Sequence, residues 1–373
     1  MWTGDIMITN PNAYDLIVAI LNAIGVYNII LGFFENMGME FVLRAIIVLV
    51  EVAAVVAFAL VTVMFLSWLE RKMFAVVQAR YGPMVTGPRG LFQPIADGIK
   101  LLGKEDIIPA TADRWIFTIA PYIVFVSVLL VYIPLPFGES LILSDLRVGL
   151  LYIIAISAIT PVSILLAGWA SNNKYSLMGA IRAVAQDISY TIPLAITAIA
   201  VVVFVGSLST VDIVNAQQGY WFGVIPKWFI FLQPLGFILF LIACIAEMGR
   251  IPFDFQESEQ ELVAGFFTEY SGMKFAMFFL AEYAHMFAVS GIIVTLFLGG
   301  WTGPAIPLIP IQITSLVYFI IKTYAVIFFA MWLRDTVPRV RIDQLLHIGW
   351  KIMIPLALLN LLVAAFVVTA GVI

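Results

Sequence analysis

Eight stretches of the sequence are predominantly apolar over about 20 residues, the length that an α-helix needs to cross the hydrocarbon core of a membrane. Backbone that crosses lipid must satisfy its own N–H and C=O groups, so apolar stretches of this length fold as helices. We therefore predict an all-α fold, a polytopic transmembrane bundle with spans near 41–66, 115–136, 148–169, 188–208, 229–247, 276–298, 311–333 and 350–372.

A ninth apolar stretch, residues 13–34, differs from the others in its polar groups. Asp15 and Asn22 lie seven residues apart and so share one helical face, and the flanking charges are acidic. We interpret this stretch as an amphipathic helix in the membrane interface rather than as another span. No repeat or soluble segment is evident, so residues 1–373 are expected to form a single membrane domain.

The composition agrees, with 63% hydrophobic and 11% charged residues against roughly 25% charged residues in soluble domains. The small net charge of −4 argues against a nucleic-acid partner. One cysteine, Cys244, excludes a disulfide framework or an all-cysteine iron–sulfur site, and two histidines are too few for a bis-histidine haem bundle. We expect no metal, flavin or haem in this chain.

Positive charge predicts the orientation. Fifteen of the 19 Lys and Arg residues follow the first, third, fifth and seventh predicted spans. Because short cytoplasmic loops carry the excess of Lys and Arg, both termini are expected on the non-cytoplasmic side. The first basic residue is Arg44, so the N-terminus lacks the positive region of a cleaved signal peptide.

Residues 70–106 form a long charged segment after the first span. Residues 70–80 follow that span without a break and place Met73, Phe74 and Val77 on one face, which predicts an amphipathic helix in the interface. An ordinary positively charged anchor would explain only the start of this segment. The remainder combines turn-forming Gly and Pro with a short helix that bears Asp97, Lys100 and Lys104 on one side. Such an ordered cytoplasmic loop indicates a site or a docking surface.

The segment after the fifth span, residues 247–275, is strongly acidic. Together with the start of the next span it holds seven carboxylates: Glu247, Asp254, Glu257, Glu259, Glu261, Glu269 and Glu282. In a helix Glu257 and Glu261 would share a face and raise each other's proton affinity. A solvated acidic loop would be polar throughout, whereas here phenylalanines interleave with the acids. Acids in apolar surroundings predict a proton path.

Four charges fall inside or beside predicted spans: Glu282, already named, and three others, Glu51, Asp187 and Lys322. Each costs roughly 2.5–3.5 kcal/mol at the bilayer centre on insertion scales. Together they indicate a hydrated or ion-paired interior. For Glu51 a structural hydrogen bond is an equal alternative to a role in transport.

Ordered sequence blocks from residue 68 to about 355 carry a family resemblance. They are ERK at Glu70–Lys72, the Gly- and Pro-rich run Arg80–Asp97, KED at Lys104–Asp106, Ser171–Tyr190, the acidic run Ala246–Glu261, ELVAGFFTEYSGMKFA, FFLAEY, and Val337–Lys351. In this order they resemble the quinone-chamber membrane subunit of respiratory complex I, called H in bacteria and subunit 1 in mitochondria. SNNKYSL and PATADRW are most similar to the cyanobacterial and plastid branch.

The resemblance implies a subunit without a redox centre that frames a quinone tunnel with a hydrophilic neighbour, which carries the terminal iron–sulfur cluster. Antiporter-like membrane subunits would be further partners. The implied tunnel residues are Glu70, Arg71, Arg80, Asp97 and Lys100. The implied proton path consists of Asp187, Glu247, Asp254, Glu257, Glu259, Glu261, Glu269 and Glu282. The substrate would be plastoquinone, ubiquinone, menaquinone or methanophenazine, in a prokaryotic plasma membrane or a thylakoid.

Three departures from the family pattern bear on the proton path. Thr191 stands where the family usually has glutamate, and Asp187 supplies a carboxylate one helical turn earlier. His285 stands where asparagine is common, and Met248 and Gly249 replace two polar residues. We predict that Asp187 has taken over the relay. The alternative is a surface aspartate near a helix start, where the helix dipole favours an acid.

Two other function classes remain open from the sequence. One is the equivalent subunit of an energy-converting hydrogenase or of an archaeal methanophenazine-reducing dehydrogenase. The charged run 70–106 favours a quinone tunnel over the hydrogenase. The other is a free-standing secondary transporter, which should show internal repeats and broken helices.

Overall fold

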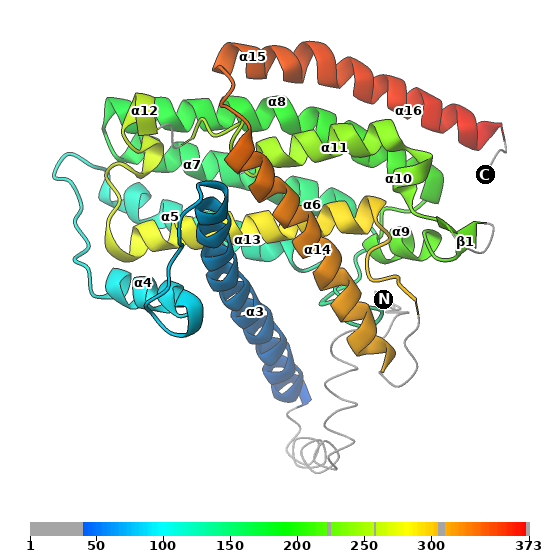
Figure 1. The fold of residues 1–373 in the computed structure, drawn as a ribbon, viewed down its shortest axis with the longest axis horizontal. Helices are drawn as coiled ribbons and strands as arrows, with labels where there is room; N and C mark the ends of the chain where they lie inside the picture. The colour runs from blue at the N-terminus through cyan, green and yellow to red at the C-terminus, as the bar shows by residue number, and fades with distance from the viewer. Residues whose placement is uncertain (1–39, 222–224, 257–258, 305–309, 371–373) are drawn as a thin grey trace, which may run out of the picture.

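The computed structural model describes residues 40–221, 225–256, 259–304 and 310–370. The interfacial helix expected at 13–34 lies outside them. The described α-helices are α3 (Glu40–Val77), α4 (Gln93–Leu102), α5 (Arg114–Val131), α6 (Gly149–Ser157), α7 (Ile159–Ala170), α8 (Lys174–Val205), α9 (Thr210–Ala216), α10 (Phe229–Leu232), α11 (Pro234–Glu247), α12 (Glu259–Leu262), α13 (Gly272–Phe297), α14 (Ile311–Thr336), α15 (Ile342–His347) and α16 (Ile354–Thr369) (Figure 1).

Short elements complete the described chain. Two 3-10 turns, η1 (Pro88–Gly90) and η2 (Gly265–Phe267), lie in the charged segments, and a π-helical turn, η3 (Ile348–Met353), joins α15 to α16. The strands β1 (Tyr220–Trp221) and β2 (Ile225–Pro226) pair antiparallel, with Trp221 opposite Ile225. Apart from this hairpin, the regular secondary structure of the described residues is therefore helical, as predicted.

Seven helical spans in the described residues are long and apolar enough to cross a membrane. They match seven of the eight predicted stretches. The remaining predicted stretch, 229–247, is divided into α10 and α11 at Gln233. Helix α11 alone has only 14 residues. Pro234 begins α11 because it has no N–H to continue the hydrogen-bond ladder of α10. The all-α membrane bundle is confirmed, and the predicted span 229–247 is broken at Gln233.

The charged segment after the first span differs from our expectation. No separate amphipathic helix lies at 70–80, because α3 continues for 38 residues to Val77. Met73 packs into the core while Val77 is 47% exposed, so the apolar face only partly contacts protein. The short helix that follows is confirmed as α4, although Lys104 lies beyond its end.

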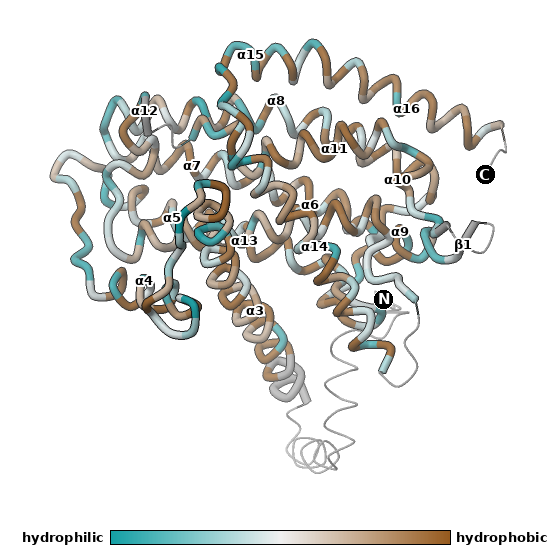
Figure 2. The backbone as a smooth tube through the Cα atoms, viewed as in Figure 1, coloured by the Kyte–Doolittle hydropathy of each residue, from teal (hydrophilic) through white to brown (hydrophobic). Residues whose placement is uncertain are grey.

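The packing centres on α8 and α13. Helix α8 packs against α7, α11 and α16, and α13 packs against α3, α5 and α14 (Figure 1). In α13, 78% of the most apolar stretch is buried, against 44% or less in the other spans. Apolar residues run along the helices, and hydrophilic residues gather at the two ends of the bundle (Figure 2). Charged groups on α13 are therefore held inside protein.

A helix interruption opens the bundle beside α8 and α13. Helices α6 and α7 form one apolar span that is interrupted at Ala158. Pro161 lacks the N–H that would bond to the carbonyl of Ser157, so the ladder cannot close there. Polar groups around the interruption are consequently available to a cavity within the span.

The C-terminal helices hold α8 in place. Trp350 Nε1 donates a hydrogen bond to Ser189 Oγ at 3.0 Å, and the Tyr190 hydroxyl donates to the Leu345 carbonyl at 3.1 Å. A side chain on Gly349 would lie 3.2 Å from the Ser189 carbonyl, so glycine permits this close approach. These contacts fix the part of α8 that carries Asp187.

Candidate functional site: a carboxylate-lined cavity and a buried ion cluster

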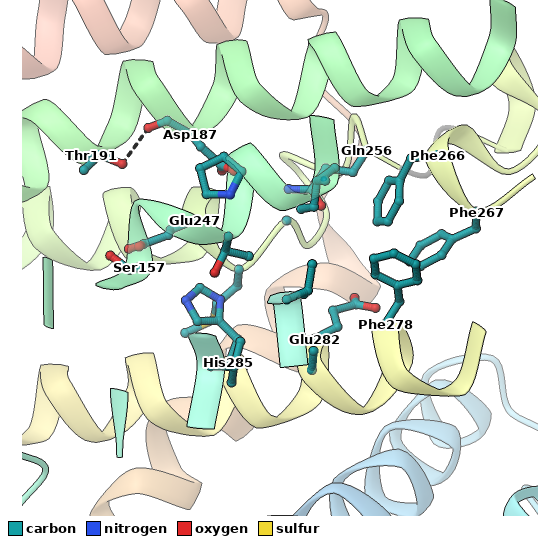
Figure 3. Close-up of a pocket in the computed structure, with 18 residues that line it drawn as sticks. Ser157, Asp187, Thr191, Glu247, Gln256, Phe266, Phe267, Phe278, Glu282 and His285 are labelled. Atoms are coloured by element: carbon teal, nitrogen blue, oxygen red, sulfur yellow. Dashed lines mark hydrogen bonds between the residues drawn. The ribbon is translucent and has the colours of Figure 1, made fainter. Parts of the chain in front are cut away.

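A cavity of about 50 Å³ lies between α5, α6, α7, α8, α11 and α13 (Figure 3). Met248, Gly249, Gln256, Phe266 and Phe267 close one side of it. The hydrophilic side chains in its lining are Ser157, Thr160, Asp187, Thr191, Glu247, Gln256, Glu282 and His285. A buried water needs roughly 10–15 Å³ of such volume and two to four polar partners. This cavity has the room and the partners for a few waters.

Asp187 and Thr191 both line this cavity, one turn apart on α8. Asp187 is 6% exposed and is the fourteenth residue of the helix, so the alternative of a surface aspartate at a helix start is wrong. The predicted span began at 188, but α8 begins at Lys174. The Thr191 hydroxyl donates to the backbone carbonyl of Asp187 at 2.7 Å, and Asp187 Oδ1 has no hydrogen-bond partner.

Glu247 is the last residue of α11 and faces Asp187 across the cavity (Figure 3). Gln186 Nε2 donates to the Ala246 carbonyl at 2.6 Å, which fixes α8 against the end of α11. The Ser157 hydroxyl lies within hydrogen-bonding reach of Glu247. The interruption at Ala158 thus places a hydroxyl beside one predicted relay residue.

Glu282 connects the cavity to a buried ion cluster. Its carboxylate is 2.9 Å from Arg250 Nη2, and Arg250 Nη1 is 3.3 Å from Glu70 Oε1. Arg334 from α14 also donates to Glu70. The side chains of Glu70 and Arg250 are each only 8% exposed, and the guanidinium of Arg250 lies over the Tyr283 ring. We call Glu70, Arg250, Glu282 and Arg334 the ion cluster.

The five predicted tunnel residues separate into three groups. Glu70 belongs to the ion cluster. Arg71 Nη1 and Asp97 Oδ2 form an ion pair at 2.6 Å that joins α3 to α4, and Gln93 donates to the same carboxylate at 3.1 Å. Arg80 and Lys100 are exposed on the surface of the same segment.

Two of the remaining acidic residues that the structure describes, Glu261 and Glu269, bind polar partners and do not line the cavity. Glu261 pairs with Arg182 of α8, and Asn173 donates to Glu269 at 2.7 Å. The side chains of Glu257 and Glu259 lie outside the described part of the structure, and α12 begins at Glu259. The hydrogen bond from Arg182 lowers the pKa of Glu261, so the expected rise in its proton affinity is wrong. The nearby arginine outweighs any neighbouring acid.

Two further intramembrane charges have different surroundings. Lys322 Nζ donates to the carbonyls of Leu298, Gly300 and Thr302 at 2.8, 3.0 and 2.7 Å, and all three of its donors are used. It therefore caps the end of α13. Glu51 is 8% exposed and its Oε1 has no hydrogen-bond partner.

In the described ranges no three His, Cys, Asp or Glu side chains are placed to hold a metal ion. The expectation that this chain binds no metal, flavin or haem remains a prediction. The polar groups of the cavity instead suit proton transfer, because carboxylates, hydroxyls and water exchange protons through hydrogen bonds.

The family model described as NADH dehydrogenase matches residues 50–365. The chain belongs to this family. A relative from Dehalococcoides mccartyi (strain CBDB1), named as the H subunit of NADH-quinone oxidoreductase, is 49% identical over 318 residues, which cover 85% of this chain and 86% of the relative. Another with the same name, from strain ATCC BAA-2266 / KCTC 15142 / 195, is 48% identical over 323 residues, 87% of each chain.

The resemblance to the quinone-chamber subunit family is thus confirmed, but its placement near the cyanobacterial and plastid branch gains no support. The sequence analysis did not identify three residues of this site, namely Ser157, Thr160 and Arg334. Ser157 and Thr160 line the cavity because Pro161 interrupts their helix, and the proline within an apolar stretch was the available signal. No sequence pattern indicated the ion pair of Arg334, because its partner Glu70 lies 264 residues away in the chain.

Proposed function

We propose that this chain is the membrane subunit of a proton-translocating, complex I-type NADH-quinone oxidoreductase, in which it forms the quinone-binding tunnel and the carboxylate path that couples quinone reduction to proton pumping. The observation that carries the proposal is the continuity of two sites. Glu282 belongs to the ion cluster and also lines the cavity with Glu247 and Asp187. A change of charge in the ion cluster therefore changes the electrostatic potential in the cavity.

The coupling follows from electrostatics. A quinone takes two electrons and two protons, so its reduction draws negative charge and then protons towards the tunnel. At an effective dielectric constant of about 20, two unit charges 4 Å apart interact by ~4 kcal/mol. A change of that size at Glu70 alters how strongly Arg250 holds Glu282. Glu282 then exchanges a proton with the cavity, and Glu247 and Asp187 carry it onward.

The arginine and aspartate of the α3–α4 pair support the tunnel part of the proposal. The ion pair between Arg71 and Asp97 holds α4 beside the end of α3. Arg71 directly follows Glu70 in the sequence. The names of the two relatives favour a quinone oxidoreductase over a hydrogenase. The quinone is a substrate, and its chemical type among ubiquinone, menaquinone, plastoquinone and methanophenazine is open. The relatives give no reason to prefer plastoquinone.

The partners proposed are other complex I-type subunits, including the hydrophilic subunits that carry the terminal iron–sulfur cluster and antiporter-like membrane subunits. The distribution of Lys and Arg supports a multi-pass topology with both termini on the non-cytoplasmic side. Residues 70–106 would then meet the hydrophilic subunits at the cytoplasmic face.

The test compares two activities of the assembled complex. Arg80→Ala and Asp97→Ala should each impair quinone reduction while electron transfer to a soluble artificial acceptor persists. Asp343→Ala is the matched control, because Asp343 also pairs with an arginine but lies exposed at the start of α15. Equal loss of both activities in assembled Arg80→Ala and Asp97→Ala complexes would count against a quinone site here.

A further inference from the structure

His285 lies at the boundary between two cavities. The carboxylate-lined cavity of about 50 Å³ and a second cavity of about 20 Å³ share three lining residues, Ser157, Glu247 and His285. The rest of the second cavity is apolar apart from Cys244. His285 is 8% exposed and its Nε2 is buried without a hydrogen-bond partner. A buried imidazole nitrogen of this kind requires an explanation, because such groups are normally satisfied by protein or water.

The helix geometry places His285 within the proposed relay. It lies three residues after Glu282 on α13, and residues at i and i+3 share a helical face. In Figure 3 His285 lies between Glu282 and Glu247 along the cavity wall. The groups that face it are Glu282 on its own helix, Glu247 on α11, Asp187 on α8, and the hydroxyls of Ser157 and Thr160, all of which line the same cavity.

We propose that His285 is a proton-transfer residue that carries protons between Glu282 and Glu247; this rests on the function proposed above. The Nε2 atom accepts a proton from the carboxylic acid of Glu282, directly or through a cavity water, which leaves a carboxylate and an imidazolium. The imidazolium then gives a proton to the carboxylate of Glu247 and returns to the neutral form. No electrons move, and each transfer conserves charge.

The surroundings make this route physically reasonable. An isolated imidazolium would be costly in an apolar interior. Each transfer here creates or removes a positive and a negative charge together, so the two desolvation costs are offset by their attraction. Apart from Cys244 and the three shared residues, the second cavity is lined by apolar side chains, which disfavour water there.

The first test uses the complete complex reconstituted in lipid vesicles. His285→Asn should lower proton pumping and coupled quinone reduction by at least about tenfold, since a positioned proton-transfer group typically contributes roughly 10²–10⁴-fold. Electron transfer to a soluble artificial acceptor should not change. The chain's other histidine, His347, is exposed on α15, so His347→Asn is the matched control and should retain all three activities.

A structural role for His285 would also reduce activity, so the second test follows the imidazole itself. Infrared difference spectra on reduction, with ring-labelled histidine, should show an imidazole protonation band in the unaltered complex and in His347→Asn. The band should vanish in His285→Asn. Its survival in His285→Asn, its absence from the unaltered complex, or normal pumping by His285→Asn would each overturn the proposal.

Failure of this inference can be told apart from failure of the proposed function. Glu247→Gln, measured in the same vesicles, removes a carboxylate of the path itself. If Glu247→Gln stops pumping while His285→Asn does not, the relay exists and His285 is not part of it. If Glu247→Gln pumps normally, the cavity does not carry the coupling protons and both proposals are wrong.

Discussion

Glu70 of α3 and Arg250, which are 180 residues apart in sequence, form an ion pair at 3.3 Å in which each side chain is only 8% exposed. Arg250 also holds Glu282 at 2.9 Å, and Arg334 joins from α14. The pairing thus links three membrane helices to the acidic segment between α11 and α12. Because buried charges are tolerated only when paired, each member depends on the others.

Arg250→Met should therefore destabilise the subunit strongly. Removing one partner from a buried ion pair typically costs about 3–5 kcal/mol, since the remaining charges stay buried without compensation. Arg71→Met removes a partner from an exposed pair on the same helix end as Glu70 and should cost about 1 kcal/mol or less. The unfolding temperature of the solubilised complex would compare the two. Equal shifts for both variants would show that burial does not decide the energetics.

The contrast between the spans and the ion cluster shows what the sequence could predict. The spans follow from length and hydropathy, which are local properties. The pairing of Glu70 with Arg250 and Arg334 depends on which helices meet, and no local pattern contains that information. The seven acids looked like one cluster in the sequence. In the structure Glu247 and Glu282 line the cavity, whereas Glu261 and Glu269 bind polar partners elsewhere.

The predicted helix boundaries were wrong where a membrane helix continues through polar residues. Residues 70–77 have an amphipathic pattern, but the pattern does not say whether the helix axis bends, and α3 simply continues. Asp187 was placed near a helix start because polar residues precede it. Helix α8 in fact begins at Lys174, capped by the Asn173 side chain, which accepts from the Tyr175 N–H at 3.0 Å. Burial of Asp187 therefore could not be inferred from hydropathy alone.

Lys322→Met should loosen the loop that follows α13. The ammonium group satisfies three carbonyls at 2.7–3.0 Å, and two of them lie in or beside Gly299 and Gly300, which both have positive φ. A buried carbonyl left without a donor costs about 1–3 kcal/mol, and these part-buried carbonyls should cost somewhat less each. Amide hydrogen exchange in residues 298–302 should accelerate clearly, while exchange in the distant helix α4 stays unchanged. Unaltered exchange in both segments would show that Lys322 does not secure the loop.

The pair between Arg182 and Glu261 predicts a pH dependence. The hydrogen bond from Arg182 lowers the pKa of Glu261 in the folded state, so the pair stabilises α12 at every pH above the unfolded value of about 4.3. That contribution is lost only as the pH falls through the lowered folded pKa. Hydrogen exchange protection of α12, corrected for intrinsic rates, should stay constant from about pH 5 to pH 8 and fall below about pH 4.

Arg182→Met provides the control for this prediction, because it removes the pair and should lower the protection of α12 at neutral pH. Glu261 is half-exposed, so the effect will be modest. Protection that changes between pH 6 and pH 8 would indicate that Glu261 titrates near neutrality, as a proton carrier of the path would.

The last prediction concerns the carboxylate that α8 places in the cavity. Asp187→Asn should lower proton pumping and coupled quinone reduction together, because Asp187 is buried with an unpartnered oxygen and faces Glu247. Arg182 is not available to neutralise it, since Arg182 pairs with Glu261. Thr191 lines the same cavity one turn further along α8. Adding Thr191→Glu to Asp187→Asn should therefore restore both activities.

The restoring variant separates a relay from a structural role, because it returns a carboxylate to the cavity without returning Asp187 itself. Asp212 is the matched control: it is an exposed aspartate at the start of α9, where an acid is favoured by the helix dipole. Asp212→Asn should leave pumping unchanged. If Asp187→Asn pumps normally, or if the double variant assembles but recovers neither activity, then the carboxylate at 187 does not replace the missing glutamate, and protons pass from Glu282 to Glu247 without it.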